Sequence, residues 1–166
     1  MGPSSPYDAG MTGAYVAVVG PSGAPDAAVL AAAREVGRLL GDAGCVVVTG
    51  GGTGVMEAAS AGAAAAGAVV VGLLPGADRS EANPHLTVAI ATGLGEVRNA
   101  LVVRAVDAVV AVGGSWGTLS EVALACRTGV PAVALLGWDL PASGGPEVAA
   151  DPADAVRRAL AGVRPA

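Results

Sequence analysis

The sequence predicts an α/β fold, in which a single-domain, Rossmann-like, doubly wound and mostly parallel sheet carries helices on both faces. Short Val-rich runs without polar alternation indicate strands that are buried on both sides, as in a parallel sheet. Ala-rich stretches of helical length separate these runs, and glycine-rich loops follow several of them. The length of 166 residues fits one domain with a single core.

The first half of the chain alternates strand and helix. Residues 1–12 are rich in Gly, Pro and Ser and are predicted to be a flexible N-terminal tail, so the domain is expected to span residues 13–166. Pro25 and Asp26 open an amphipathic helix of about four turns that ends near Gly41. The other expected elements are a strand at 14–19, a strand at 45–49, a helix at 55–66 and a strand at 68–74.

The second half continues the same alternation. Its expected elements are a polar loop at 75–84, a strand at 86–91, a helix at 96–106, a strand at 108–112, a helix at 118–126, a strand at 132–136 and a loop at 141–146. Asp151 and Pro152 then open a short C-terminal helix. About six or seven parallel strands result.

Composition excludes several classes of function. All nine basic residues are Arg, so the chain lacks the Lys required by pyridoxal-phosphate enzymes and by Walker-type phosphate loops. The net charge of −5 disfavours nucleic acid as a partner. One His and two widely separated Cys predict no metal site, and no resident cofactor is expected. Because neither a secretory signal nor a membrane span is recognisable, we expect a cytoplasmic protein.

Three glycine-rich loops each follow a Val-rich strand and precede a helix. Glycine lets a backbone approach an anion closely, and a helix N-terminus supplies free N–H groups and a favourable dipole. The loops therefore predict a phosphate or nucleotide site, with purely structural turns as the alternative. The dinucleotide fingerprint is not met, which disfavours NAD. The candidate phosphate ligands are Gly20, Ser22, Gly51, Gly52, Thr53, Gly54, Gly113, Gly114, Ser115, Gly117 and Thr118.

Two charged residues are candidates for the same site. Glu121 is expected in the first turn of the helix after the third loop, where it either points to the site or closes a capping box with Thr118. Arg98 is expected in the first turn of another helix, where a cation is electrostatically unfavourable and suggests an anionic partner. That partner is a phosphate or Glu121, or else Glu96 in a local salt bridge. The 75–84 loop is either a lid or a solvated loop.

The segments Gly50-Gly-Gly-Thr-Gly-Val-Met56 and Gly113-Gly-Ser-Trp-Gly-Thr-Leu-Ser-Glu121, together with Arg98, resemble the lonely guy family, once mislabelled as lysine decarboxylases. The resemblance covers residues 14–136. It implies a homodimer or larger assembly that hydrolyses nucleoside 5′-monophosphates, such as AMP or cytokinin ribotides, to free base and ribose 5-phosphate. It also implies catalytic roles for Arg98 and Glu121, and a phosphate-binding loop that includes Gly114, Gly117 and Thr118.

Local differences place the chain near another branch of this family. The phosphoribohydrolases usually carry Pro where this chain has Val112, and Lys where it has Asn99, which is itself a candidate ligand contact. The local sequence is closer to that of the molybdenum cofactor carrier proteins, which bind a pterin phosphate without turning it over. Two functions therefore stay open at this point, a phosphoribohydrolase and a non-catalytic carrier of a phosphorylated cofactor.

Overall fold

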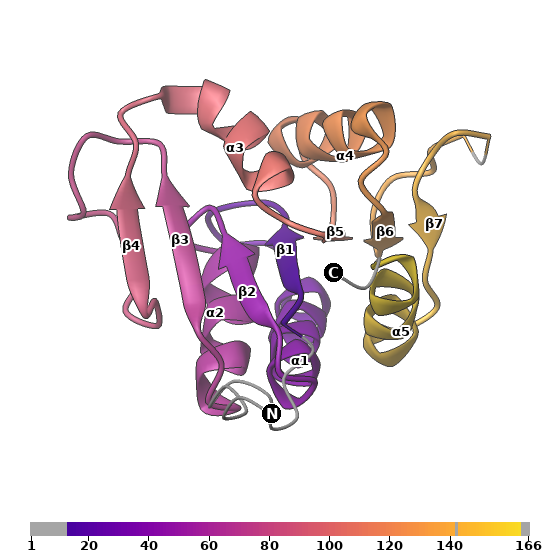
Figure 1. Ribbon diagram of the computed structural model, residues 1–166, viewed down its shortest axis with the longest axis horizontal. Helices are drawn as coiled ribbons and strands as arrows, with labels where there is room; N and C mark the ends of the chain where they lie inside the picture. Colours follow the sequence, from indigo (N-terminus) through magenta and orange to yellow (C-terminus); the bar gives the residue numbers. More distant parts are fainter. Residues whose placement is uncertain (1–12, 142, 164–166) are drawn as a thin grey trace, which may run out of the picture.

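Seven parallel strands form one sheet in the order β4-β3-β2-β1-β5-β6-β7 (Figure 1). The computed structural model describes residues 13–141 and 143–163, so the predicted tail at 1–12 lies outside the described residues. The strands are β1 Tyr15–Val19, β2 Val46–Thr49, β3 Val70–Leu74, β4 Val88–Ala91, β5 Ala108–Val112, β6 Ala132–Leu135 and β7 Glu147–Val148. The predicted single-domain α/β fold is confirmed.

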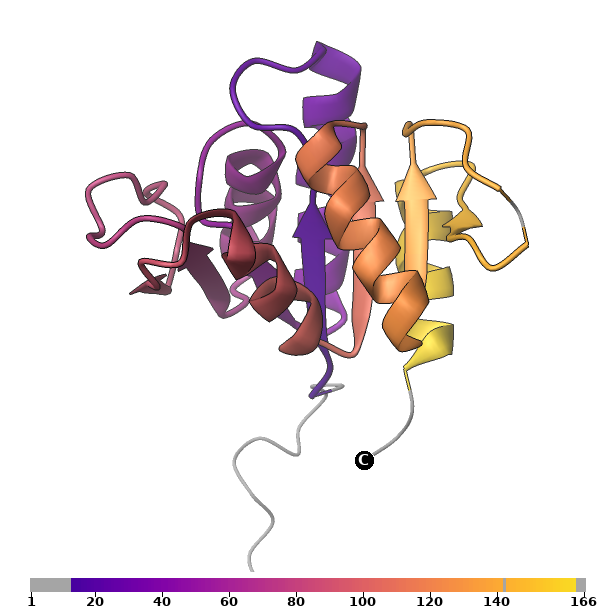
Figure 2. The ribbon, with the colours of Figure 1, turned by 90° about the horizontal axis from the view of Figure 1, so that it is seen from above.

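Helices cover both faces of this sheet (Figure 2). The helices are α1 Ala27–Asp42, α2 Val55–Ala65, α3 Arg98–Arg104, α4 Trp116–Thr128 and α5 Pro152–Gly162, with a 3₁₀ turn, η1, at Gly95–Val97. Helices α1, α2 and α5 pack on one face, and α3 and α4 pack on the other. Each face thereby buries its own hydrophobic cluster against the Val-rich strands.

Helices α1 and α2 approach each other closely because glycines lie at their contact. A Cβ on Gly37 would lie 2.1 Å from the carbonyl oxygen of Ala59, and a Cβ on Gly62 would lie 1.9 Å from that of Arg34. Both distances are far below van der Waals contact, so larger residues would push the helices apart. This tight packing holds together α1 and α2, the two helices that follow the first two glycine-rich loops.

The order of strands defines where a ligand is expected. The chain winds outward from β1 through β2 to β4, then returns to β5 beside β1 and winds the other way to β7. In an open parallel sheet, such a reversal leaves a crevice at the carboxyl ends of the two central strands. The loops after β1, β2 and β5 all lie at this edge.

Most elements differ from the prediction by one or two residues at an end, and three differences bear on the structure. The segment predicted as one helix at 96–106 is a 3₁₀ turn, η1, followed by the shorter helix α3. Helix α4 begins two residues before the predicted start at Thr118 and ends two residues later. The two-residue strand β7 was not predicted as a strand, because it is too short to show a periodic pattern.

Candidate functional site

The three glycine-rich loops contact one another at the carboxyl edge of the sheet. A Cβ on Gly20 would lie 2.4 Å from the carbonyl oxygen of Val112, at the end of β5. The N–H of Val55, the first residue of α2, donates to the carbonyl oxygen of Pro21 at 3.0 Å. A Cβ on Gly54 would lie 2.5 Å from that same Pro21 oxygen. The three loops therefore lie together at this edge, and glycine is required for their contact at Gly20 and Gly54.

The second loop is braced by its own polar groups. The N–H of Gly51 donates to Oγ1 of Thr49 at 3.1 Å. The Nδ2 of Asn83 donates to the carbonyl oxygens of Gly51, at 3.2 Å, and Gly52, at 3.0 Å. Oγ1 of Thr53 accepts a hydrogen bond from the N–H of Gly23 in the first loop. The Gly51 N–H and the Thr53 hydroxyl oxygen thus already have intramolecular partners, and Ser22 is exposed beside Gly54.

The third loop ends in a capped helix N-terminus. Ser115 is the N-cap of α4, and its Oγ accepts from the N–H of Thr118 at 3.2 Å and lies 2.8 Å from Oγ1 of Thr118. Trp116 and Gly117 lie between this cap and Thr118. Their N–H groups are first-turn donors for which the helix itself has no acceptor. A Cβ on Gly117 would meet only Oγ of Ser115, at 3.8 Å. The start of α4 therefore presents two open donors to an anion.

This cap corrects two expectations about Glu121. The helix begins at Trp116, so Glu121 lies in its second turn and not its first. The predicted capping box between Thr118 and Glu121 is wrong, because Ser115 supplies the cap and bonds the N–H of Thr118. Glu121 is instead part of the buried face of α4, with 7% of its surface exposed.

Burial dominates the electrostatics of Glu121. Desolvation raises the pKa of its carboxyl group to about 7, and the nearby positive charge of Arg98 partly opposes that rise. Both the charged and the uncharged form of this carboxyl group are therefore accessible near neutral pH. A buried carboxyl with such a pKa is typical of functional sites.

Arg98 is the first residue of α3, as expected, and extends across the end of β2. A Cβ on Gly50 would lie 2.4 Å from Nη1 of Arg98, so glycine at this position makes room for the guanidinium. Burial lowers the pKa of Arg98, and the charge of Glu121 acts in the opposite direction. Arg98 and Glu121 are thus brought together from α3 and α4, close enough for their charges to interact.

One nitrogen of the Arg98 guanidinium lacks a partner within the protein. Its Nε is buried and has no hydrogen-bond partner. The ion pairs among the described residues do not include Arg98, so the predicted alternative of a local salt bridge with Glu96 is wrong. Burying the N–H of a guanidinium without a hydrogen-bond partner costs free energy, which an anionic ligand would offset.

Asn99, the candidate beside Arg98, bonds to the protein. Its Nδ2 donates to Oγ of Ser120 at 3.1 Å, and that hydroxyl donates to the carbonyl oxygen of Gly117. Asn99 therefore ties α3 to the first turn of α4. Its amide helps fix the position of α3, which carries Arg98, relative to the N-terminus of α4.

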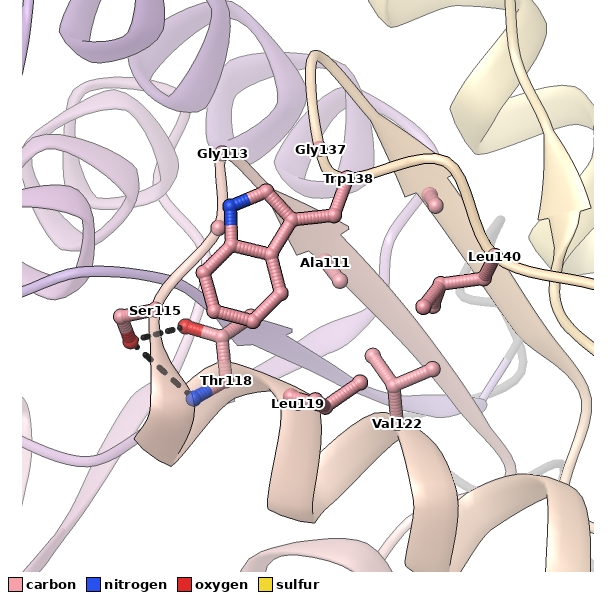
Figure 3. Close-up of a pocket in the computed structure, with 11 residues that line it drawn as sticks. Ala111, Gly113, Ser115, Thr118, Leu119, Val122, Gly137, Trp138 and Leu140 are labelled. Carbon is pink, nitrogen blue, oxygen red and sulfur yellow. Dashed lines mark hydrogen bonds between the residues drawn. The ribbon is translucent and has the colours of Figure 1, made fainter.

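A pocket opens on the other side of the α4 N-terminus, where the indole of Trp138 lies over the third loop (Figure 3). A Cβ on Gly114 would lie 2.8 Å from Nε1 of Trp138. The ring of Trp138 also contacts that of Trp116, edge to face, with centroids 5.1 Å apart. The pocket is lined by Ala111, Gly113, Gly114, Ser115, Thr118, Leu119, Val122, Ala134, Gly137, Trp138 and Leu140.

Sequence reasoning missed three residues of this region: Gly50, Asn83 and Trp138. Gly50 accommodates Arg98, Asn83 braces the second loop, and Trp138 covers the third. Gly50 could have been inferred from the loop, whereas Asn83 and Trp138 approach the site only through the fold.

Comparison with known proteins now places the chain. A sequence profile of the SLOG cluster4 family matches residues 13–156. The chain belongs to the SLOG cluster4 family. The predicted resemblance to the lonely guy family, in the branch near molybdenum cofactor carriers, is confirmed at this level.

Two solved structures resemble this SLOG protein over most of its length. The molybdenum cofactor binding protein of Rippkaea orientalis has 34% sequence identity and a TM-score of 0.83, over 87% of this chain and 94% of that one. The molybdenum cofactor carrier protein of Chlamydomonas reinhardtii has 33% identity and a TM-score of 0.79, over 90% and 99%. An uncharacterised protein of Archaeoglobus fulgidus is 41% identical over 97 residues, and the match spans 58% of this chain and 64% of that relative.

Two further observations concern metals and membranes. Within residues 13–141 and 143–163, no group of three or more His, Cys, Asp or Glu side chains is arranged to hold a metal ion. Among the helices of this described part, none combines the length and apolar character needed to cross a membrane.

Proposed function

We propose that this SLOG protein binds a phosphorylated pterin, such as the molybdenum cofactor, and holds it without chemical conversion. The observation that carries the proposal is the guanidinium of Arg98, which is half-buried at the loop edge with an unpartnered Nε. A protein that keeps a partly desolvated guanidinium with an unbonded N–H is prepared for an anion. The two relatives described as binding or carrying the molybdenum cofactor support a phosphorylated pterin as the molecule that provides this anion.

The phosphate is proposed to bind between Arg98 and the start of α4. The N–H groups of Trp116 and Gly117 would donate to its oxygens, and the helix dipole would favour its charge. Arg98 would supply the neutralising cation through charge-assisted hydrogen bonds. The N–H groups of Gly52 and Gly54, in the second loop, complete the set of candidate donors.

A phosphoribohydrolase is the second candidate, because Arg98 and Glu121 lie together at the same edge. Hydrolysis of an N-glycosidic bond builds positive charge on the ribose, which an ionised carboxylate stabilises. Burial raises the pKa of Glu121 to about 7, which leaves both the ionised and the uncharged form accessible near neutral pH. The two relatives described as binding or carrying the molybdenum cofactor support binding over hydrolysis.

The test combines binding with product analysis. Wild-type protein is titrated calorimetrically with 6-hydroxymethylpterin phosphate and with AMP, and each ligand is then analysed by chromatography after incubation. The proposal predicts binding of the pterin phosphate, recovery of both ligands intact, and loss of binding in Arg98→Met. Release of adenine and ribose 5-phosphate from AMP, abolished in Glu121→Gln, would replace the carrier by the hydrolase.

We also propose the setting in which the protein works. A small phosphorylated ligand is the expected partner, and the net charge of −5 disfavours nucleic acid. A cytoplasmic location and a homodimer or larger assembly are part of the same proposal. Sedimentation of the purified chain would test the assembly, and a monomer at micromolar concentration would contradict it.

A further inference from the structure

The two tryptophans of the chain meet at the start of α4. The sequence contains no Phe and only two Tyr, so large aromatic rings are rare. Trp116 and Trp138 are nevertheless in contact, with ring centroids 5.1 Å apart and an interplanar angle of 70°. They come from different elements, since Trp116 begins α4 and Trp138 lies in the segment after β6.

Trp116 is exposed to an extent that packing does not require. It has 80% of its surface exposed, compared with 43% for Trp138. An indole has a large apolar surface, and keeping it in water forgoes the free energy that burial would give. Its exposed surface is available to another flat ring.

Trp138 holds its partner ring in place. Its own indole lies over the third loop (Figure 3). A Cβ at position 114 would lie 2.8 Å from its Nε1, so only glycine leaves room for the ring there. Edge-to-face contact with this anchored ring restricts the orientations of Trp116. The exposed ring is therefore better ordered than a lone surface tryptophan would be.

The position of Trp116 links this ring to the proposed phosphate site. As the first residue of α4, Trp116 carries one of the two open N–H donors at that helix N-terminus. Side chains of a helix tilt toward its N-terminus, so the indole extends to the same end as the donor. One residue thus offers a hydrogen bond to a phosphate and a π-face to whatever is attached to it.

We infer that Trp116, supported by Trp138, forms a stacking subsite for the planar fused heteroaromatic ring of a phosphorylated ligand. This inference rests on the proposed function, because it assigns the ring of a ligand whose phosphate binds at the loop edge. A pterin and a purine share the required chemistry, a flat bicyclic ring that stacks on an aromatic side chain.

The experiment compares phosphorylated ligands with and without a planar heteroaromatic ring. AMP, 6-hydroxymethylpterin phosphate and ribose 5-phosphate are titrated calorimetrically into the wild type, Trp116→Leu and Trp116→Phe. Leu keeps apolar bulk but removes the π-system, and Phe restores a ring. Trp116→Leu is expected to lower the affinity for AMP and for the pterin phosphate roughly 5- to 150-fold. Ribose 5-phosphate should change less than about twofold, and Trp116→Phe should regain most of the lost affinity.

The outcomes separate the subsite from the proposed function. Equal weakening of all three ligands in Trp116→Leu would show that Trp116 supports the loop and not the ring, and unchanged affinities would also overturn the subsite. A shift to smaller species in sedimentation, with ligand affinities kept, would assign Trp116 to contact between copies instead. If the wild type binds none of the three ligands, the proposed function fails and the subsite fails with it. Comparison of AMP with the pterin phosphate identifies the preferred ring.

Discussion

Replacing Glu121 by Gln changes how stability depends on pH. In the folded protein, burial raises the pKa of this carboxyl from its ordinary value of 4.5 to about 7. Between these two values, the folded state keeps a proton that the unfolded state has released, so stability falls as pH rises. The step from 4.5 to about 7 corresponds to about 3 kcal/mol of unfolding free energy. Gln is neutral at every pH and close in shape, so it removes this dependence.

Urea unfolding of both proteins at several pH values between 4 and 8 measures the effect. The free energy of unfolding of the wild type, relative to Glu121→Gln, should fall by about 3 kcal/mol across this range, mostly between pH 4.5 and 7. All other titrating groups are shared, so they cancel in the difference. A difference that stays constant with pH would refute the reasoning, because Glu121 would then titrate alike in both states.

Three further substitutions test the site residue by residue. Arg98→Met should weaken phosphate-ligand binding roughly tenfold or more without lowering the thermal midpoint, because it removes a half-buried cation whose Nε has no hydrogen-bond partner; a clear fall in the midpoint would contradict this. Gly50→Ala should weaken phosphate-ligand binding, because its Cβ would lie 2.4 Å from Nη1 of Arg98. Gly76→Ala serves as the control, since its Cβ would meet no atom closer than 3.8 Å. Equal affinities of the two variants in calorimetry would contradict this role of Gly50. Asn83→Ala should lower the free energy of unfolding by about 2 kcal/mol, measured in urea, and Asn99→Ala, which loses one hydrogen bond at a half-buried site, by about 1 kcal/mol or less; equal losses would show that the buried amide does not brace the loop.

Much of the fold follows from the alternation of Val-rich runs and Ala-rich stretches. Buried parallel strands such as β2 and β5 have no polar face. Their continuous apolar sequences therefore indicate both that they are strands and that both of their faces are buried. The same reasoning fails for β7, where only Glu147 and Val148 pair with β6. Such a short strand is created by its neighbour in the sheet and leaves no pattern of its own.

The site was predictable where function depends on backbone, and less so where it depends on side-chain partners. Gly20 and Gly54 mark the close approach of two loops, which their residue type already indicates. The position of Glu121 in its helix depends on where α4 begins. The spacing of Thr118 and Glu121 is compatible with a capping box, but in the structure Ser115 is the N-cap of α4. Asn83 reaches the second loop from about 30 residues away in sequence, through hydrogen bonds that only the tertiary fold establishes.

The central claim is that Arg98 and the α4 N-terminus hold a phosphorylated pterin that leaves unchanged. Calorimetric titration of the wild type and Arg98→Met with 6-hydroxymethylpterin phosphate, followed by chromatography of the recovered ligand, tests it most directly. The account predicts saturable binding by the wild type, binding weakened roughly tenfold or more in Arg98→Met, and intact ligand in both cases. Equal affinity in the two proteins, or recovery of a converted product from the wild type, would contradict it.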